Sequence, residues 1–183
     1  MDLFDKQIIP LSLADGRMAN IVFWPSWLGT VSAANLLDVA ITQTPWRTDF
    51  INIMGKKIPI PRLQNWFGDP STSYTYSRIR LQAVEFPKWM DKLRSDVEIE
   101  TGHPFNRALV NYYRDGSDSV DWHADNEREL GFEPVIASVS LGAERVFQLR
   151  HNVSKEIIKI NLPHGSLLPV SYTHLRAHET EEN

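Results

Sequence analysis

The sequence predicts an α+β protein whose core is a β sandwich or barrel. Two helical segments are expected early in the chain and several short strands later, the order typical of this class. Its 183 residues, 42% of them hydrophobic, suffice for one domain with a substantial core. With 9 Gly and 11 Pro, the composition excludes collagen-like and disordered chains.

Each expected element rests on a local pattern. Residues 32–41 carry apolar side chains on one helical face, and residues 87–100 start at Pro87, repeat apolar residues at every fourth position and stop before Gly102. Gly and Pro interrupt residues 46–76, which favours short strands and turns. Strands are then expected at residues 105–113, 135–141, 145–150 and 156–162.

Composition also limits the compartment and the chemistry. The absence of cysteine excludes disulfides, cysteine-ligated zinc, iron–sulfur clusters and thiol catalysis. No apolar run approaches the roughly 18 residues of a membrane span, and the acidic start at residues 1–5 does not resemble a signal peptide. We expect an intracellular protein without membrane association, in the cytoplasm of a bacterium or the nucleus of a eukaryote.

Charge is segregated along the chain, although the net charge is only −4. Residues 54–94 are mainly basic and residues 115–133 mainly acidic. The first segment is suited to a polyanion and the second to a cation, while two solvated faces of a mixed surface explain the pattern too. The basic residues are Lys56, Lys57, Arg62, Arg78, Arg80, Lys88, Lys92 and Arg94, and the acidic ones are Asp115, Asp118, Asp121, Asp125, Glu127, Glu129 and Glu133.

Two segments carry residues suited to chemistry. In the strand expected at 105–113, alternation places Leu109, Asn111 and Tyr113 on one face, which suits a carboxylate ligand or forms the polar rim of a half-buried strand. After a turn, His123 and Asp125 lie two residues apart and project from one face of an extended segment. They make two thirds of a 2-His-1-carboxylate iron site, or a hydrogen-bonded pair in a surface loop.

The order of six motifs is more specific than any one of them. Together they resemble the AlkB family of Fe(II)- and 2-oxoglutarate-dependent dioxygenases, which repair alkylated nucleic acid, and the likeness runs from about Ile51 to Leu168. The motifs are Pro61-Arg62-Leu63, Tyr74-Thr75-Tyr76-Ser77, Asn111-Tyr112-Tyr113-Arg114-Asp115-Gly116, His123-Ala124-Asp125-Asn126-Glu127, Ile136-Ala137-Ser138-Val139-Ser140-Leu141-Gly142 and His164-Gly165-Ser166-Leu167-Leu168.

The resemblance implies a double-stranded β-helix, or jelly roll, with N-terminal helices and a nucleotide-recognition lid. It implies one dioxygenase domain over residues 1–168, with the lid at about 45–80 and the core at about 103–168. Residues 169–183 then form a tail outside the family pattern, and the C-terminal strands of the jelly roll are missing. A monomer is expected from the habit of the family.

The resemblance also implies a role for each candidate residue. His123 and Asp125 would bind Fe(II), and Leu109, Asn111 and Tyr113 would hold 2-oxoglutarate. Tyr76 would stack on a flipped-out base, and Met54 would act as an apolar wedge at the tip of a hairpin that probes the duplex. The implied substrate-binding residues are Met54, Gly55, Lys56, Arg62, Tyr74, Thr75, Tyr76, Asn126, Glu127 and Arg150.

The implied reaction is demethylation of 1-methyladenine- or 3-methylcytosine-type bases in DNA or RNA. Dioxygen is the second cosubstrate, 2-oxoglutarate becomes succinate, and the methyl leaves as formaldehyde. Because these methylated bases are cationic and buried in a duplex, an acidic pocket and base flipping suit them, while basic residues meet the phosphates. The charge segregation fits this arrangement.

The sequence departs from the family after Leu168. Relatives place a third iron ligand, a histidine, downstream of the leucine pair, and an Arg-x-Asn-x-Thr-x-Arg run then holds 2-oxoglutarate. Here Thr180 stands near the expected histidine, and His174 and His178 are out of register. We expect a truncated or frame-shifted copy that lacks the third ligand and binds iron and 2-oxoglutarate poorly.

Two other functions stay open from the sequence. A non-catalytic nucleic-acid-binding module of the same fold would keep the lid and lose the iron, although it would not need His123, Asp125, Asn111 and Tyr113. A dioxygenase of the same fold acting on protein or lipid would not need the Tyr74–Tyr76 segment or the basic stretch. DNA versus RNA, and single versus double strand, are not decided by the sequence.

Overall fold

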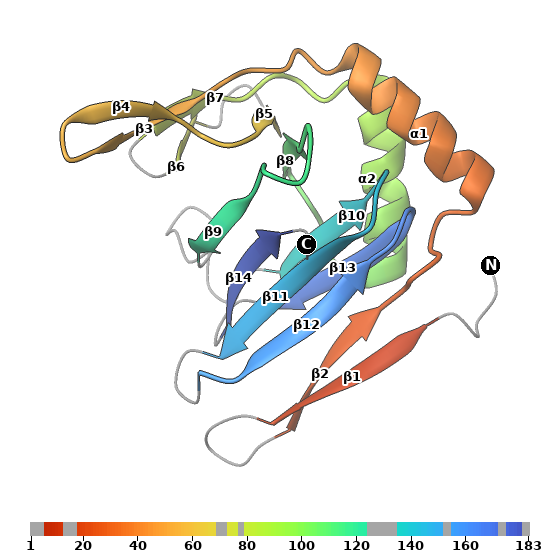
Figure 1. The fold of residues 1–183 in the computed structure, drawn as a ribbon. Coiled ribbons are helices and arrows are strands. Elements are labelled where there is room, and N and C mark those ends of the chain that lie inside the picture. Colours follow the sequence, from red (N-terminus) through yellow and green to blue (C-terminus); the bar gives the residue numbers. More distant parts are fainter. Residues whose placement is uncertain are drawn as a thin grey trace. The chain divides into compact units, whose positions relative to one another are not determined.

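In the part of the chain that the structure describes, the fold is mostly β with two helices, consistent with the expected jelly roll (Figure 1). The computed structural model of the chain describes residues 6–12, 18–68, 73–76, 79–123, 135–151, 155–171 and 175–180. The chain divides into two compact units. The first unit comprises Met1–Asp38 and Ser119–Asn183, and the second comprises Val39–Asp118.

The main sheet of the first unit is antiparallel and has the strand order β12-β11-β14-β9. In β12, Ile158, Ile160 and Leu162 alternate with Lys159 and Asn161, as in a half-buried strand. Ala177 of β14 is directly opposite His123 of β9, and His178 is opposite Gln148 of β11. The four strands are β9 (Val120–His123), β11 (Arg145–His151), β12 (Ile157–Leu162) and β14 (Leu175–Thr180).

The described residues of the first unit also form two antiparallel strand pairs. A bridge between Trp24, next to β2, and Leu167 of β13 connects the two pairs. The buried apolar core of this unit lies between β2, β13 and the β11–β12 half of the main sheet, and includes Phe23, Phe147, Leu149 and Leu168. The paired strands are β1 (Gln7–Ser12) with β2 (Met18–Phe23), and β10 (Val135–Ser140) with β13 (Ser166–Ser171).

The described part of the second unit contains three antiparallel strand pairs, helix α2 and the C-terminal end of helix α1 (Thr30–Gln43). Helix α2 (Lys88–Thr101) begins after Pro87 and ends at Gly102, whose φ of 72° closes the helix as glycine commonly does. Met90 and Val97 are its buried residues. The strand pairs are β3 (Phe50–Ile53) with β4 (Lys56–Pro59), β5 (Leu63–Gly68) with β8 (Arg107–Tyr112), and β6 (Ser73–Tyr76) with β7 (Ile79–Gln82).

Both expected helices are confirmed: helix α1 (Thr30–Gln43) covers residues 32–41, and α2 covers residues 88–100 of the second. The four strands expected after Gly102 are confirmed as β8, β10, β11 and β12. The chain begins with the β1–β2 hairpin rather than with helices, so α1 alone precedes the strands of the second unit. The tail contains β14, where Leu175 and Ala177 alternate with Arg176 and His178 in the period of a strand.

Candidate functional site

One polar face of the second unit is formed where β5 pairs with β8. Gln64 lies opposite Asn111, and Trp66 lies opposite Leu109, so these four residues share one side of the ladder. The expected common face of Leu109 and Asn111 is therefore confirmed, and Tyr113 follows directly after β8. Leu109 is exposed and Asn111 is half-buried.

Arg62, two residues before Gln64, reaches the same face. Its Nε donates a hydrogen bond to Oδ1 of Asn111 across 3.1 Å. The guanidinium is placed where water has little access, because Arg62 is only 5% exposed. Such a bond between a charged donor and an amide oxygen is stronger than one between two neutral groups.

A second buried polar pair anchors β5 beside this face. Gln64 is 2% exposed, and its Nε2 donates to Oδ2 of Asp49 across 2.8 Å. Arg47 donates to the other carboxylate oxygen at 3.5 Å, and its backbone exchanges two hydrogen bonds with that of Gln64. The strand that carries Arg62 into position is thus fixed by backbone and side-chain bonds together.

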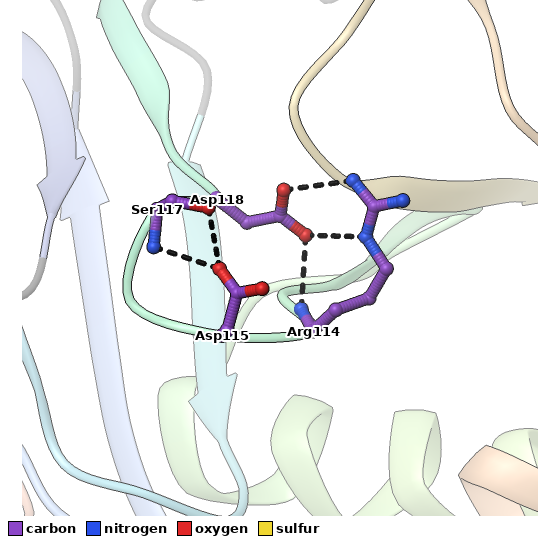
Figure 2. A network of polar contacts seen from close by, with 4 residues as sticks. All are labelled: Arg114, Asp115, Ser117 and Asp118. Atoms are coloured by element: carbon purple, nitrogen blue, oxygen red, sulfur yellow. Dashed lines mark hydrogen bonds and ion pairs between the residues drawn. The ribbon is translucent and has the colours of Figure 1, made fainter.

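A polar network closes the turn after β8 (Figure 2). Asp118, only 3% exposed, accepts hydrogen bonds from Nε and Nη2 of Arg114 at 2.8 Å each and from the Arg114 backbone N–H at 2.9 Å. Asp115 accepts from the Ser117 hydroxyl at 2.5 Å and from the Ser117 backbone N–H at 2.8 Å. Both carboxylates therefore hold the turn by accepting bonds from nearby donors, an arrangement typical of Asp in turns.

These bonds shift the pKa values of Asp115 and Arg114 in opposite directions. The hydrogen bonds from Ser117 lower the pKa of Asp115, because they stabilise its charged form. The hydrogen bond to Asp118 and the negative charge of that residue raise the pKa of Arg114. Asp115 is therefore charged and engaged within the turn at neutral pH.

His123 ends β9 in the first unit. Its Nδ1 lies 2.9 Å from the backbone carbonyl oxygen of Asp121. Because a carbonyl oxygen can only accept, Nδ1 carries the proton, and Nε2 is the nitrogen that offers a lone pair. Histidine ligands of protein metal sites are commonly oriented by such a bond.

Arg150 of β11 lies on the Trp122 side of β9. The guanidinium carbon is 4.2 Å from the centre of the Trp122 ring, within the range of a cation–π contact. Both residues belong to the first unit and are half-buried. The contact holds a planar cation next to the strand that carries His123.

Met54 and Gly55 form the turn of the β3–β4 hairpin, which extends as a two-stranded ribbon (Figure 1). Their φ angles are 49° and 79°, the signs required at both central residues of a type I′ turn. Met54 is 99% exposed, and Lys56 and Lys57 follow on an exposed strand. The hairpin presents an apolar tip flanked by two cations.

The structure describes some of the remaining predicted site residues and not others. Tyr74, Thr75 and Tyr76 lie in β6, paired with β7. Asp125, Asn126, Glu127 and His174 lie outside the described residues. Among the described residues, no group of at least three histidine and acidic side chains could hold a metal ion. Neither described helix has the length and apolar character needed to cross a membrane.

Sequence reasoning missed the partners that hold the candidate residues. In the sequence, Asp118 is one acid among several, and no motif marks Asp49 or Gln64. Trp122 directly precedes His123, so alternation along the strand could have suggested that it faces the opposite side of the sheet. No sequence signal pairs Arg62 with Asn111, because they are 49 residues apart.

The chain was compared with a family sequence model and with individual known proteins, and the two comparisons agree. The sequence model of the 2OG-Fe(II) oxygenase superfamily matches residues 20–178, and so continues past Leu168. The alpha-ketoglutarate-dependent dioxygenase alkB homolog 3 of Rattus norvegicus is 36% identical over 173 residues, which cover 88% of this chain and 57% of that protein. The same protein of Homo sapiens is 34% identical, covering 88% and 59% respectively.

The DNA oxidative demethylase ALKBH2 of Bos taurus is 37% identical over 130 residues, covering 67% of this chain and 47% of the relative. The chain thus spans about half to three fifths of the length of these relatives. The superfamily match extends over most of the chain, and these relatives carry AlkB names. The chain belongs to the 2OG-Fe(II) oxygenase superfamily, as an AlkB-like member.

Proposed function

We propose that this protein is an oxidative demethylase of alkylated bases in DNA or RNA, of the 1-methyladenine and 3-methylcytosine type, acting as a monomer. Fe(II), 2-oxoglutarate and dioxygen are the cofactor and cosubstrates of its family. Relatives named as a dioxygenase and as a DNA oxidative demethylase support the reaction class. The single observation that carries the proposal is the orientation of His123 within a family-matched segment.

The position of the proton on the His123 ring suits a ligand of iron. Its proton sits on Nδ1, bound to the Asp121 carbonyl oxygen, so Nε2 is the metal-binding nitrogen. Asp125, two residues further on, would supply a carboxylate oxygen. When bound, Fe(II) with 2-oxoglutarate and dioxygen supplies the oxidation that converts the methyl group to formaldehyde and the cosubstrate to succinate.

Asn111, Leu109 and Tyr113 fit the cosubstrate. Among the described residues, Nδ2 of Asn111 has no hydrogen-bond partner, so its two N–H donors are open to a ligand oxygen. The hydroxyl of Tyr113 is a second donor for a carboxylate, and Leu109 adds an exposed apolar wall. A dicarboxylate with an aliphatic middle matches this combination of donors and apolar surface.

The remaining candidates fit a nucleic-acid substrate. At the hairpin tip, Met54 would enter the base stack while Lys56 and Lys57 meet phosphates. A lid over residues 45–80 would contain this hairpin and Tyr74, Thr75 and Tyr76. Asn126 and Glu127 would face the extruded cationic base, and Arg150, held 4.2 Å from the centre of the Trp122 ring, would contact the strand beside it.

Product analysis tests the function. We incubate the chain with Fe(II), 2-oxoglutarate, ascorbate and an oligonucleotide carrying one 1-methyladenine, and measure succinate and the unmodified base by mass spectrometry. Because His174 and His178 are out of register for the third ligand, we expect slow turnover that requires saturating Fe(II) and 2-oxoglutarate. His123→Ala should abolish both products.

The binding experiment run in parallel separates the competing functions. Preferential binding of the methylated strand, with no succinate formed at any Fe(II) concentration, would favour the binding module. Succinate release without any affinity for DNA or RNA would favour a dioxygenase with another substrate. His103→Ala is the matched control, because His103 is exposed and follows α2, and it should leave product formation unchanged.

A further inference from the structure

Arg62 is one of the few buried charged residues in the described part of the chain, and its contact with Asn111 has a chemical consequence. An asparagine amide has an acceptor end and a donor end, and its side chain can turn to present either one. A guanidinium has only hydrogen-bond donors, so it can bond only to the oxygen end of the amide. The 3.1 Å bond from Nε therefore fixes Oδ1 of Asn111 toward Arg62.

The other end of the amide is then fixed as well. With Oδ1 engaged by Arg62, Nδ2 presents its two N–H groups away from the guanidinium. Such a group binds carboxylate or keto oxygens and rejects ligands that donate hydrogen bonds at this point. Without Arg62, both rotations of the amide are available, and a carboxylate ligand has to select one of them.

The neighbours of Arg62 hold its guanidinium in a fixed position. Arg62 directly precedes β5, in which Gln64 lies opposite Asn111 in the ladder with β8. Gln64 is itself tied to Asp49 and to the backbone of Arg47. Backbone and side-chain bonds thus hold the guanidinium next to Asn111, and burial shields the bond from competing water.

We propose that Arg62 is a positioning residue that locks the Asn111 amide as a hydrogen-bond donor and so determines 2-oxoglutarate affinity. This role rests on the proposed function, and it differs from a direct contact of Arg62 with nucleic acid. Arg62 acts on the cosubstrate through Asn111. Its removal therefore affects one ligand and leaves the other unaffected.

Two dissociation constants test this role. Binding of 2-oxoglutarate in the presence of Mn(II), which supports binding without turnover, is measured by calorimetry, and binding of a methylated oligonucleotide by fluorescence anisotropy. Arg62→Met keeps the aliphatic stem and removes every donor. We expect it to weaken 2-oxoglutarate binding about twofold or more, since the ligand then has to select one of two rotations of the Asn111 amide, and to leave oligonucleotide binding unchanged.

A double-mutant cycle shows whether Arg62 acts through Asn111. Asn111→Ala removes the donor itself and should weaken 2-oxoglutarate binding more than Arg62→Met, and the double variant should be no worse than Asn111→Ala, because Arg62 acts only through the amide. Arg62→Lys should recover part of the affinity. Lys92→Met, which removes an exposed cation of α2, should change neither constant.

The outcomes are distinguishable. Loss of oligonucleotide affinity in Arg62→Met with intact 2-oxoglutarate binding would make Arg62 a nucleic-acid contact and overturn the positioning role. Additive losses in the double variant would overturn it too, because the residues would then act independently. If the unsubstituted chain binds no 2-oxoglutarate, the proposed function fails first and the positioning role fails with it. Circular dichroism of each variant checks that the fold is retained.

Discussion

At the scale of single residues, the candidate site is built from polar groups whose orientation is set by one neighbour each. Nδ1 of His123 is held by the Asp121 carbonyl oxygen, and Oδ1 of Asn111 by Arg62. In both cases the partner can only accept or only donate, so it selects one state of a side chain that has two. The ligand-binding end of each residue follows from that choice.

The turn between β8 and β9 gives a residue-scale prediction. Ser117→Ala removes the hydroxyl that lowers the pKa of Asp115, and the pKa of this carboxyl should rise toward its ordinary value. When folding lowers the pKa of a carboxyl, the charged group stabilises the protein at pH values above the unfolded-state pKa of about 3.9. This stabilisation is lost as the pH falls through the folded-state pKa. The variant should therefore be less stable at neutral pH.

Urea unfolding at neutral pH and near pH 3 measures this difference. The difference in free energy of unfolding between parent and variant should be small but present at neutral pH and should disappear in acid. Ser95→Ala is the control, because the hydroxyl of Ser95 donates to a backbone carbonyl and has no carboxylate partner. A gap that persists unchanged in acid would mean that Ser117 acts through packing and not through the charge of Asp115.

The sequence predicted which residues of β8 share a face, but not which contacts hold the candidate residues. Alternation alone placed Leu109 and Asn111 on one face, because strand period is a local property. The Arg62–Asn111 and Arg150–Trp122 contacts join different strands, and no local pattern carries that information. The roles of Asp125, Asn126 and Glu127 stay predictions that rest on resemblance.

At the scale of elements, the β3–β4 hairpin combines an unfavourable turn residue with an exposed apolar tip. Met54 adopts a left-handed φ that costs a side chain with a β-carbon about 1–2 kcal/mol, whereas Asn at this position suits a type I′ turn before Gly55. An exposed methionine in this left-handed turn position is consistent with a binding role. The turn would be more stable with another residue.

Met54→Asn separates turn stability from binding. We expect the free energy of unfolding to stay the same or rise by about 0.5–1 kcal/mol, and affinity for a methylated duplex to fall roughly tenfold because the wedge is lost. Affinity for the methylated single strand should not change. Anisotropy titrations with both oligonucleotides, beside thermal unfolding, provide the measurement.

Ile99→Asn is the matched control for the hairpin variant. It replaces an apolar residue that is also largely exposed, on α2, and it should leave duplex binding at the parent level. Equal duplex affinity of Met54→Asn and the parent would remove the wedge role from the hairpin. A parallel loss of single-strand affinity would instead indicate a general contribution of the hairpin to nucleic-acid binding.

Helices were predicted from the sequence more readily than the outer strands. Apolar periodicity predicted both helices, and Pro87 and Gly102 marked the two ends of α2, because these signals are local. Strands β1, β2, β13 and β14 were not anticipated, since short strands gain their stability from pairing across the chain. The missing C-terminal strands stay a prediction, although β14 now occupies a sheet position in the tail.

At the scale of the whole molecule, charge segregation yields a prediction about salt. If Lys56 and Lys57 contact phosphates, the double variant Lys56→Gln/Lys57→Gln should bind duplex DNA more weakly at low salt and with a shallower salt dependence. Each lost phosphate contact lowers the slope of log K against log salt by about 0.9. We therefore expect the slope to fall by roughly 1 to 2, measured by anisotropy over a salt series.

Lys92→Gln is the control for the salt series. It removes a cation of the same basic segment whose exposed side chain is paired with Asp96 at 2.8 Å. Its slope should equal that of the parent. An unchanged slope in the double variant would place the phosphate contacts elsewhere, and a change equal to that of Lys92→Gln would show that only net charge matters.

The position of β14 in the main sheet has a consequence for the opening of the native state. Among the described strands, β9 is paired with β14 alone, and β14 connects it to β11. When β14 separates, the amide groups of β9 lose their ladder partners at the same moment. The two strands should therefore exchange their amide hydrogens as one cooperative unit, so that the backbone around His123 is no more protected than residues 175–180.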